Sequence, residues 1–232
     1  MRTRTVLQFL ASAVVLIIGA PAWSAGGGGM PSSGTGNFDM PQRARTPEDM
    51  ARESYNSGIR HLKDAKEYDE EVAKATDPKK VAKATEKAQK AYQKGLKEFT
   101  NSVTKMPTMY EAWNYVGFTQ RHLGDYRASL DAYAKALELK PNYPEAIEYR
   151  GEAFLGLNAL DDAKQSYMSL YRMSRPLADQ LLVAMKSWVE KRKQDAQGVD
   201  STTLESFAGW VNERAAIAAQ TASVVTTPPA RW

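Results

Sequence analysis

The sequence predicts an all-α protein: a solenoid of about three helical hairpins, the first of them elongated, closed by C-terminal capping helices. The first observation is self-similarity, because six residues of the segment 110–143 return 34 positions later in the segment 144–177. The second is spacing, since apolar and small residues in each copy fall at helical intervals with one break in the middle. The recurring residues are Glu111, Ala112, Tyr115, Gly117, Leu123 and Tyr133, which return as Glu145, Ala146, Tyr149, Gly151, Leu157 and Tyr167.

The first 25 residues have the layout of a cleaved secretory signal. Arg2 and Arg4 precede an apolar run over residues 6–19, and small residues suited to signal peptidase follow, with cleavage expected within residues 22–25. The apolar run is shorter than the roughly 20 residues that a transmembrane helix needs. We therefore expect a periplasmic or secreted protein. The alternative is an inner-membrane protein anchored by an uncleaved N-terminus.

Residues 26–46 predict a flexible linker, because they are rich in Gly, Ser and Pro and too poor in aliphatic residues to bury a core. A helix is expected to begin directly afterwards, with Thr46 as its N-cap and Pro47 in its first turn. The repeated hairpins are then expected over residues 47–177.

The charge and the cysteine content argue against several classes of function. The formal net charge of +4 falls to +2 when Arg2 and Arg4 are removed with the signal, since 29 basic residues then face 27 acidic ones. So small an excess does not indicate nucleic-acid binding. Because the chain has no cysteine, it has no disulfide, thiolate metal site or cysteine nucleophile, and packing alone must stabilise it.

The segment 51–109 predicts an elongated copy of the hairpin. Its 59 residues exceed the 34-residue repeat by 25, and the excess should lengthen both helices, which are expected to meet at Asp77 and Pro78. The return arm carries lysines on one stripe, namely Lys83, Lys87, Lys90, Lys94 and Lys97. One interpretation pairs this basic stripe with the acidic outgoing arm, and the other makes it a docking site for an acidic partner or an anionic lipid surface.

Capping helices are expected over residues 178–220, as the end of a solenoid requires. The first should begin at Pro176 and carry a continuous apolar stripe. The second should begin near Ser201, where Glu205 would complete a capping box. Residues 221–232, rich in Thr, Pro and Ala, predict a loose tail.

The repeated segments resemble the tetratricopeptide repeat, with its pattern W-x2-L-G-x2-Y, then A-x3-F, then P. In 110–143 the matching positions hold Trp113, Val116, Gly117, Tyr133, Ala136 and Pro141, while Gln120 and Ser129 depart from the pattern. The copy in 144–177 matches more weakly. The resemblance implies an exported bacterial protein of this repeat type, with a small residue such as Gly117 letting the two helices of a hairpin lie close together.

The resemblance also implies a concave groove, lined by the first helix of each hairpin, that binds another protein. The groove residues carried over are Tyr55 in the first unit, Glu111, Asn114, Tyr115, Phe118 and Arg121 in the second, and Glu145, Glu148, Tyr149 and Glu152 in the third. Family members that clamp a terminal carboxylate use Lys and Asn where this chain has Tyr55, Ile59 and Tyr115, so that mode is not expected. The glutamates suggest a partner peptide or helix that carries Lys or Arg, or else they only keep an empty or self-filled groove soluble.

We predict no catalytic residues, no metal and no cofactor. The sequence contains no Gly-rich phosphate loop, nucleophile elbow or H-E-x-x-H pattern, and adjacent Asp161 and Asp162 would point in different directions on a helix. The predicted function is a non-enzymatic adaptor or scaffold that binds other proteins in the bacterial cell envelope. The alternative is a structural or self-assembling envelope component that contacts a membrane or an acidic partner through its lysine-rich hairpin.

Overall fold

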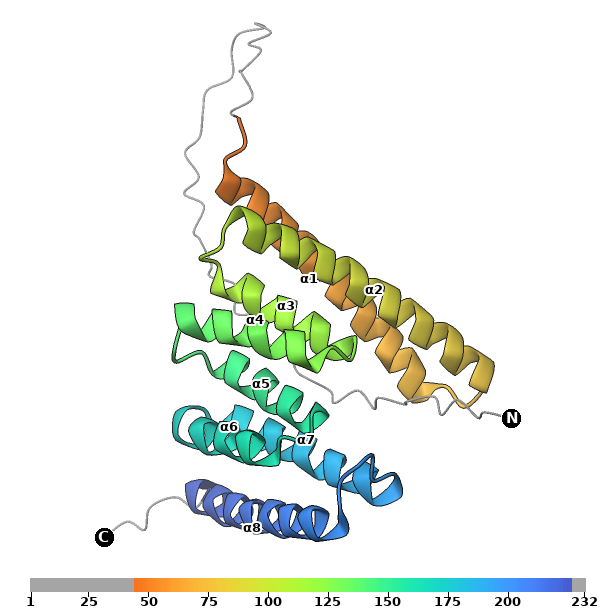
Figure 1. Ribbon diagram of the computed structural model, residues 1–232, viewed down its shortest axis with the longest axis vertical. Helices are drawn as coiled ribbons and strands as arrows, with labels where there is room; N and C mark the ends of the chain where they lie inside the picture. Colours follow the sequence, from red (N-terminus) through yellow and green to blue (C-terminus); the bar gives the residue numbers. More distant parts are fainter. Residues whose placement is uncertain (1–43, 227–232) are drawn as a thin grey trace, which may run out of the picture.

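The computed structural model describes residues 44–226, and within that range it holds eight α-helices and no strand (Figure 1). The predicted all-α fold is therefore confirmed. The predicted signal sequence and nearly all of the predicted linker lie outside the described residues. The helices are α1 (Pro47–Lys74), α2 (Pro78–Lys105), α3 (Tyr110–His122), α4 (Tyr126–Leu139), α5 (Pro144–Gly156), α6 (Leu160–Met173), α7 (Arg175–Gln194) and α8 (Ser201–Thr226).

Consecutive helices pair as hairpins that stack one on the next, from α1 and α2 at one end to α7 and α8 at the other (Figure 1). The core follows this stack in two main clusters. One cluster joins α1 to α4 around residues such as Phe99 and Val116, and the other joins α5 to α8 around Leu170 and Met185. This arrangement is the helical-hairpin solenoid that the sequence predicts.

The first hairpin is elongated, as predicted, because α1 and α2 each run for 28 residues, or about 42 Å. Thr46 and Asp49 form a reciprocal capping box at the start of α1. Asp77 is the N-cap of α2 and accepts a hydrogen bond from the backbone N–H of Lys79 at 2.9 Å. The far half of this hairpin, which we call the arm, extends beyond the shorter helices next to it (Figure 1).

Small residues set the distance between helices within the first two hairpins. A β-carbon built on Gly117 would lie 2.6 Å from the ring of Tyr133 on α4, and one built on Gly58 would lie 2.6 Å from the ring of Phe99 on α2. The third hairpin differs, because the atom nearest to Gly151 belongs to Leu181 on α7. Tyr167 packs instead toward Trp210 on α8, with ring centroids 5.5 Å apart.

The last two helices close the solenoid. The indole N–H of Trp188 on α7 donates to the carbonyl of Leu155 on α5 at 2.7 Å, which ties the cap to the third hairpin. The predicted capping box with Glu205 is wrong: Asp200 takes that role and accepts from the backbone N–H of Thr203 at 2.9 Å. Aspartate just before the helix is itself a preferred cap, so no box is needed.

Helix α8 continues beyond residue 220 to Thr226, into the segment predicted as a loose tail. Alanines at 215, 216, 218 and 219 have high helix propensity and carry the helix toward that segment. Among the helices that the structure describes, none is long and apolar enough to cross a membrane.

Candidate protein-binding groove

The predicted groove residues come from α1, α3 and α5, the first helices of the three hairpins. Four of them form one row of aromatic rings across these helices. The ring centroids of Tyr55 and Tyr115 are 5.7 Å apart, those of Tyr115 and Phe118 are 6.1 Å apart, and those of Phe118 and Tyr149 are 5.0 Å apart. The row also rests on Phe99, which is fully buried and stacks on Tyr115 at 5.1 Å. The structure therefore brings these predicted residues together.

Tyrosines and glutamates gather where Tyr55 of α1 meets the N-terminal halves of α3 and α5. We call this group the phenol–carboxylate cluster; it consists of Tyr55, Tyr110, Glu111, Tyr115, Tyr143 and Glu145. Glu145 is exposed and Glu111 is half-buried, so both carboxylates can be reached from solvent.

The carboxylates of the cluster lie close enough to its phenols to affect their pKa values. Burial, and after it the charge of Glu145, raises the pKa of Tyr143. Burial, the neighbouring Tyr115 and then Glu111 raise the pKa of Tyr55. Burial is the larger cause of both shifts, and the carboxylates add to it because nearby negative charge opposes the loss of a phenol proton. The two accessible carboxylates themselves give this surface negative charge, which favours cations.

The chain's own Lys140 already lies against part of the cluster. Its ammonium donates to the Tyr110 hydroxyl at 3.1 Å and lies 4.4 Å from the centroid of that ring and 4.8 Å from that of Tyr143. Contacts of this kind attract a cation to an aromatic face. Tyr110 and Tyr143 were missed by the sequence analysis, although each stands at the first turn or N-cap of a helix that bears a predicted groove residue.

Asn114 is a predicted groove residue that the structure places below the surface. Only 1% of it is exposed, and its amide N–H donates to the Tyr143 hydroxyl at 3.5 Å. Its carbonyl oxygen Oδ1 has no hydrogen-bond partner among the described residues. Asn114 therefore supports a ring of the phenol–carboxylate cluster from beneath, and the prediction that it faces a partner is corrected.

The two other predicted glutamates and Arg121 form a second cluster between α3 and α5. Arg121 makes an ion pair with Glu152, and both side chains are largely buried. Glu148 is 1% exposed, and burial, followed by the charge of Glu152, raises its pKa well above the usual value. The predicted role of these glutamates in binding a basic peptide is therefore corrected. The physical reason is that both carboxylates lie one turn apart on the side of α5 that packs on α3, where the Arg121 guanidinium attracts them.

The basic stripe lies on the outer side of α2, and all five of its lysines are exposed. Lys90 pairs with Glu86 on the same helix at 2.5 Å, and the Lys87 ammonium lies 4.8 Å from the ring centroid of Tyr68 on α1. The predicted pairing of lysines with acids of the other arm does not occur among the ion pairs of residues 44–226. Hydrogen bonds between a neutral and a charged group join α1 and α2 instead: the Tyr92 hydroxyl donates to Asp69 at 2.5 Å, and the Lys105 ammonium donates to the Ser54 hydroxyl at 3.1 Å.

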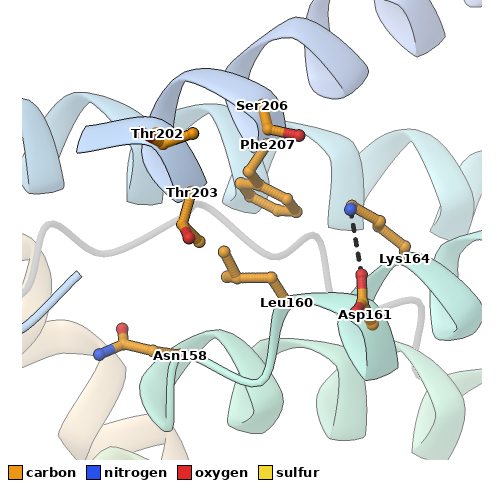
Figure 2. A pocket seen from close by; sticks show the side chains of 8 residues that line it. All are labelled: Asn158, Leu160, Asp161, Lys164, Thr202, Thr203, Ser206 and Phe207. Carbon is orange, nitrogen blue, oxygen red and sulfur yellow. Dashed lines mark hydrogen bonds and ion pairs between the residues drawn. The ribbon is translucent and has the colours of Figure 1, made fainter. Parts of the chain in front are cut away.

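A hollow of about 420 Å³ lies between the starts of α6 and α8 (Figure 2). Lys164 and Asp161 pair across 3.1 Å at its edge, and Phe207 forms part of its floor. The rest of the lining consists of Leu160 and of hydroxyl and amide side chains, which present no nucleophile with a base beside it. Within the described part of the chain, no three His, Cys, Asp or Glu side chains are placed to hold a metal ion.

Residues 110–143 match the family model of the tetratricopeptide repeat. A search of curated proteins finds no match to the chain. The stacked hairpins and the matched segment together support the interpretation of the chain as a tetratricopeptide repeat protein. Repeats of this family generally mediate binding to other proteins and are typically non-enzymatic. A role in binding proteins is compatible with the row of rings and the accessible carboxylates on the first helices.

Proposed function

We propose that this protein is a non-enzymatic adaptor of the bacterial cell envelope, which binds a partner peptide or helix on the surface formed by α1, α3 and α5. The phenol–carboxylate cluster is the observation that carries the proposal. It combines two accessible carboxylates with partly buried tyrosine rings, and tyrosine is among the residues that contribute most to binding at protein interfaces. The secretory layout of residues 1–25 supports the location.

The chemistry of the cluster favours a partner segment that carries Lys or Arg beside apolar side chains. Glu111 and Glu145 supply the negative charge, while Tyr55 and Tyr115 supply partly exposed rings that Lys140 does not contact. A cation held by both a carboxylate and a ring gains Coulombic attraction and cation–π attraction together. Of the predicted groove glutamates, Glu111 and Glu145 are accessible, whereas Glu148 is buried.

A displayed library of short random peptides tests this preference. We expect the bound fraction to be enriched in Lys or Arg next to Leu, Ile or Phe. Changing Glu111→Gln and Glu145→Gln together should then weaken the selected peptides on the order of tenfold, because an interface charge is left without its partner.

The matched control replaces two exposed glutamates away from the cluster, Glu71→Gln and Glu205→Gln, which changes the net charge by the same amount. This control should leave the affinity unchanged. Selection of acidic peptides, or equal affinity for both double variants, would refute the proposed recognition.

A further inference from the structure

The basic stripe lies on a face of α2 that no other described part of the chain covers, and we propose that this face docks against an anionic phospholipid surface. The five lysines are exposed on α2, whose hairpin with α1 extends beyond the shorter helices (Figure 1). This inference does not depend on the groove, because it concerns another helix and the opposite sign of charge.

The geometry of α2 places the lysines in one line. Its buried residues, among them Val81, Ala84 and Ala88, face α1, whereas the stripe recurs three and four residues apart on the opposite side. From Lys83 to Lys97 the stripe covers 15 residues, and the 14 steps between its ends correspond to about 21 Å of helix. Five ammonium groups on one side of a straight helix can reach a common plane at the same time.

Most of this positive charge is not neutralised by the protein. Lys83, Lys94 and Lys97 make no ion pair within residues 44–226, and Lys87 contacts only an aromatic ring there. Asp69 on the neighbouring arm is occupied by the Tyr92 hydroxyl. The face therefore retains a positive field that extends about a Debye length, or roughly 8 Å at physiological ionic strength.

The chemistry favours a lipid surface over an acidic peptide. Every basic residue of α2 is a lysine, a point charge on a flexible stem, whereas arginine is the side chain suited to bidentate recognition of one carboxylate. The exposed neighbours Ala82, Gln89 and Gln93 are small or polar, and exposed Glu86 is charged, so none of them offers a large apolar anchor. The hollow between α6 and α8 is lined by residues outside the stripe. A convex row of separate charges fits a broad anionic plane, where each lysine adds its own attraction.

Sedimentation with vesicles tests the proposal. The chain from Gly26 to Trp232 should be used, because it contains every residue of the described fold and leaves out the apolar segment that would itself enter a bilayer. We expect it to bind vesicles that contain phosphatidylglycerol, to ignore vesicles of phosphatidylcholine, and to dissociate as salt is raised. Changing Lys83, Lys87, Lys90 and Lys94 to Gln should lower the partition coefficient at least about tenfold.

A control variant separates the stripe from net charge. Lys63, Lys135, Lys186 and Lys193 are exposed lysines outside the stripe, and changing these four to Gln removes the same charge. This control should bind vesicles almost as well as the unchanged chain, and circular dichroism should show equal helix content for both variants. Equal losses from the two variants would overturn the proposal, as would binding to poly-glutamate with no binding to anionic vesicles.

The absence of cysteine allows a second readout on the same samples. A single fluorescent label at Gln93→Cys, beside the stripe, should be quenched by a quencher carried on the lipid head groups, and a label at Ser169→Cys on α6 should not. Stronger quenching at position 169 would show that another face meets the membrane and would overturn the assignment to α2.

Discussion

At Gly117 the lack of a side chain decides how closely α3 and α4 approach each other. The Tyr133 ring fills the space that a β-carbon would take, and this ring is itself fully buried. It therefore has no room to move aside. Gly209 on α8 provides the contrast, because a β-carbon there would meet no atom within 4 Å.

The change Gly117→Ala should consequently destabilise the fold by about 1–3 kcal/mol, since overpacking outweighs the better helix propensity of alanine. Gly209→Ala should stabilise it by about 0.5–1 kcal/mol through propensity alone. Urea unfolding of the two variants measures both effects. If the two changes shifted stability in the same direction, the close packing of α3 on α4 would not be the cause.

Glu148 makes stability depend on pH. Because burial and Glu152 raise its pKa in the folded state, the folded protein holds this proton at pH values where the unfolded chain has lost it. The contribution of Glu148 to the unfolding free energy should therefore be greatest below about pH 4.5, the ordinary pKa of a glutamate. This contribution should be lost as pH rises toward the raised pKa of the folded state. Its oxygen Oε2 has no hydrogen-bond partner in the described fold, which adds to the cost of ionising it.

We expect Glu148→Gln to raise the melting temperature by several degrees at pH 8 and to have little effect at pH 4, because the amide remains neutral throughout. Glu205→Gln, at an exposed position on α8, is the matched control and should change the melting temperature little at either pH. A gain of equal size at pH 4 and pH 8 would contradict the assignment of this pH dependence to Glu148.

The repeat pattern predicts which residues lie on the first helices, but not how deeply each is buried. Tyr55, Tyr115 and Glu145 are accessible or partly accessible as predicted, whereas Glu148 and Asn114 are closed off. Their burial depends on which groups of the neighbouring hairpin face them, such as Arg121 and Tyr143. Such contacts lie about one repeat apart in sequence and follow from the stacking of whole hairpins.

The elongated hairpin of α1 and α2 is an element whose two halves differ in packing. Near the body it buries large side chains such as Tyr92 and Phe99, while near the Asp77 turn its buried residues include only small or β-branched ones, such as Ala84 and Val81. Fewer buried apolar atoms mean a smaller free energy for local opening.

Hydrogen exchange should therefore show the distal arm, residues 66–88, opening well before α3 and α4. The rates are measured by mass spectrometry on peptides from each helix. Equal protection along the whole of α1 and α2 would mean that the hairpin opens only together with the body, contrary to this expectation.

Local caps explain why the starts of α1 and α2 were predictable from the sequence. Thr46 before Pro47, and Asp77 before Pro78, are local signals that need no tertiary contact. The end of α8 was less predictable, because the alanines that favour a helix give way to a β-branched stretch that predicts its loss.

At the scale of the whole molecule, two charged surfaces belong to different parts of one solenoid. The phenol–carboxylate cluster is acidic and joins α1, α3 and α5, whereas the basic stripe lies on α2 alone. An adaptor with this arrangement could hold a basic segment of a partner while the arm rests on an anionic membrane. The sequence predicted both sets of charges, and stacking decided which carboxylates remained accessible.

The most direct test of the account is photocrosslinking in cells that make the protein. A benzophenone side chain is introduced in place of exposed Asn142, just before α5 and beside the cluster, or, as a control, in place of exposed Arg172 on α6. We predict a discrete adduct with another envelope protein from position 142, lost when Glu111→Gln and Glu145→Gln are added, and none from position 172. No adduct at position 142, or the same adduct from both positions, would contradict binding on the first helices.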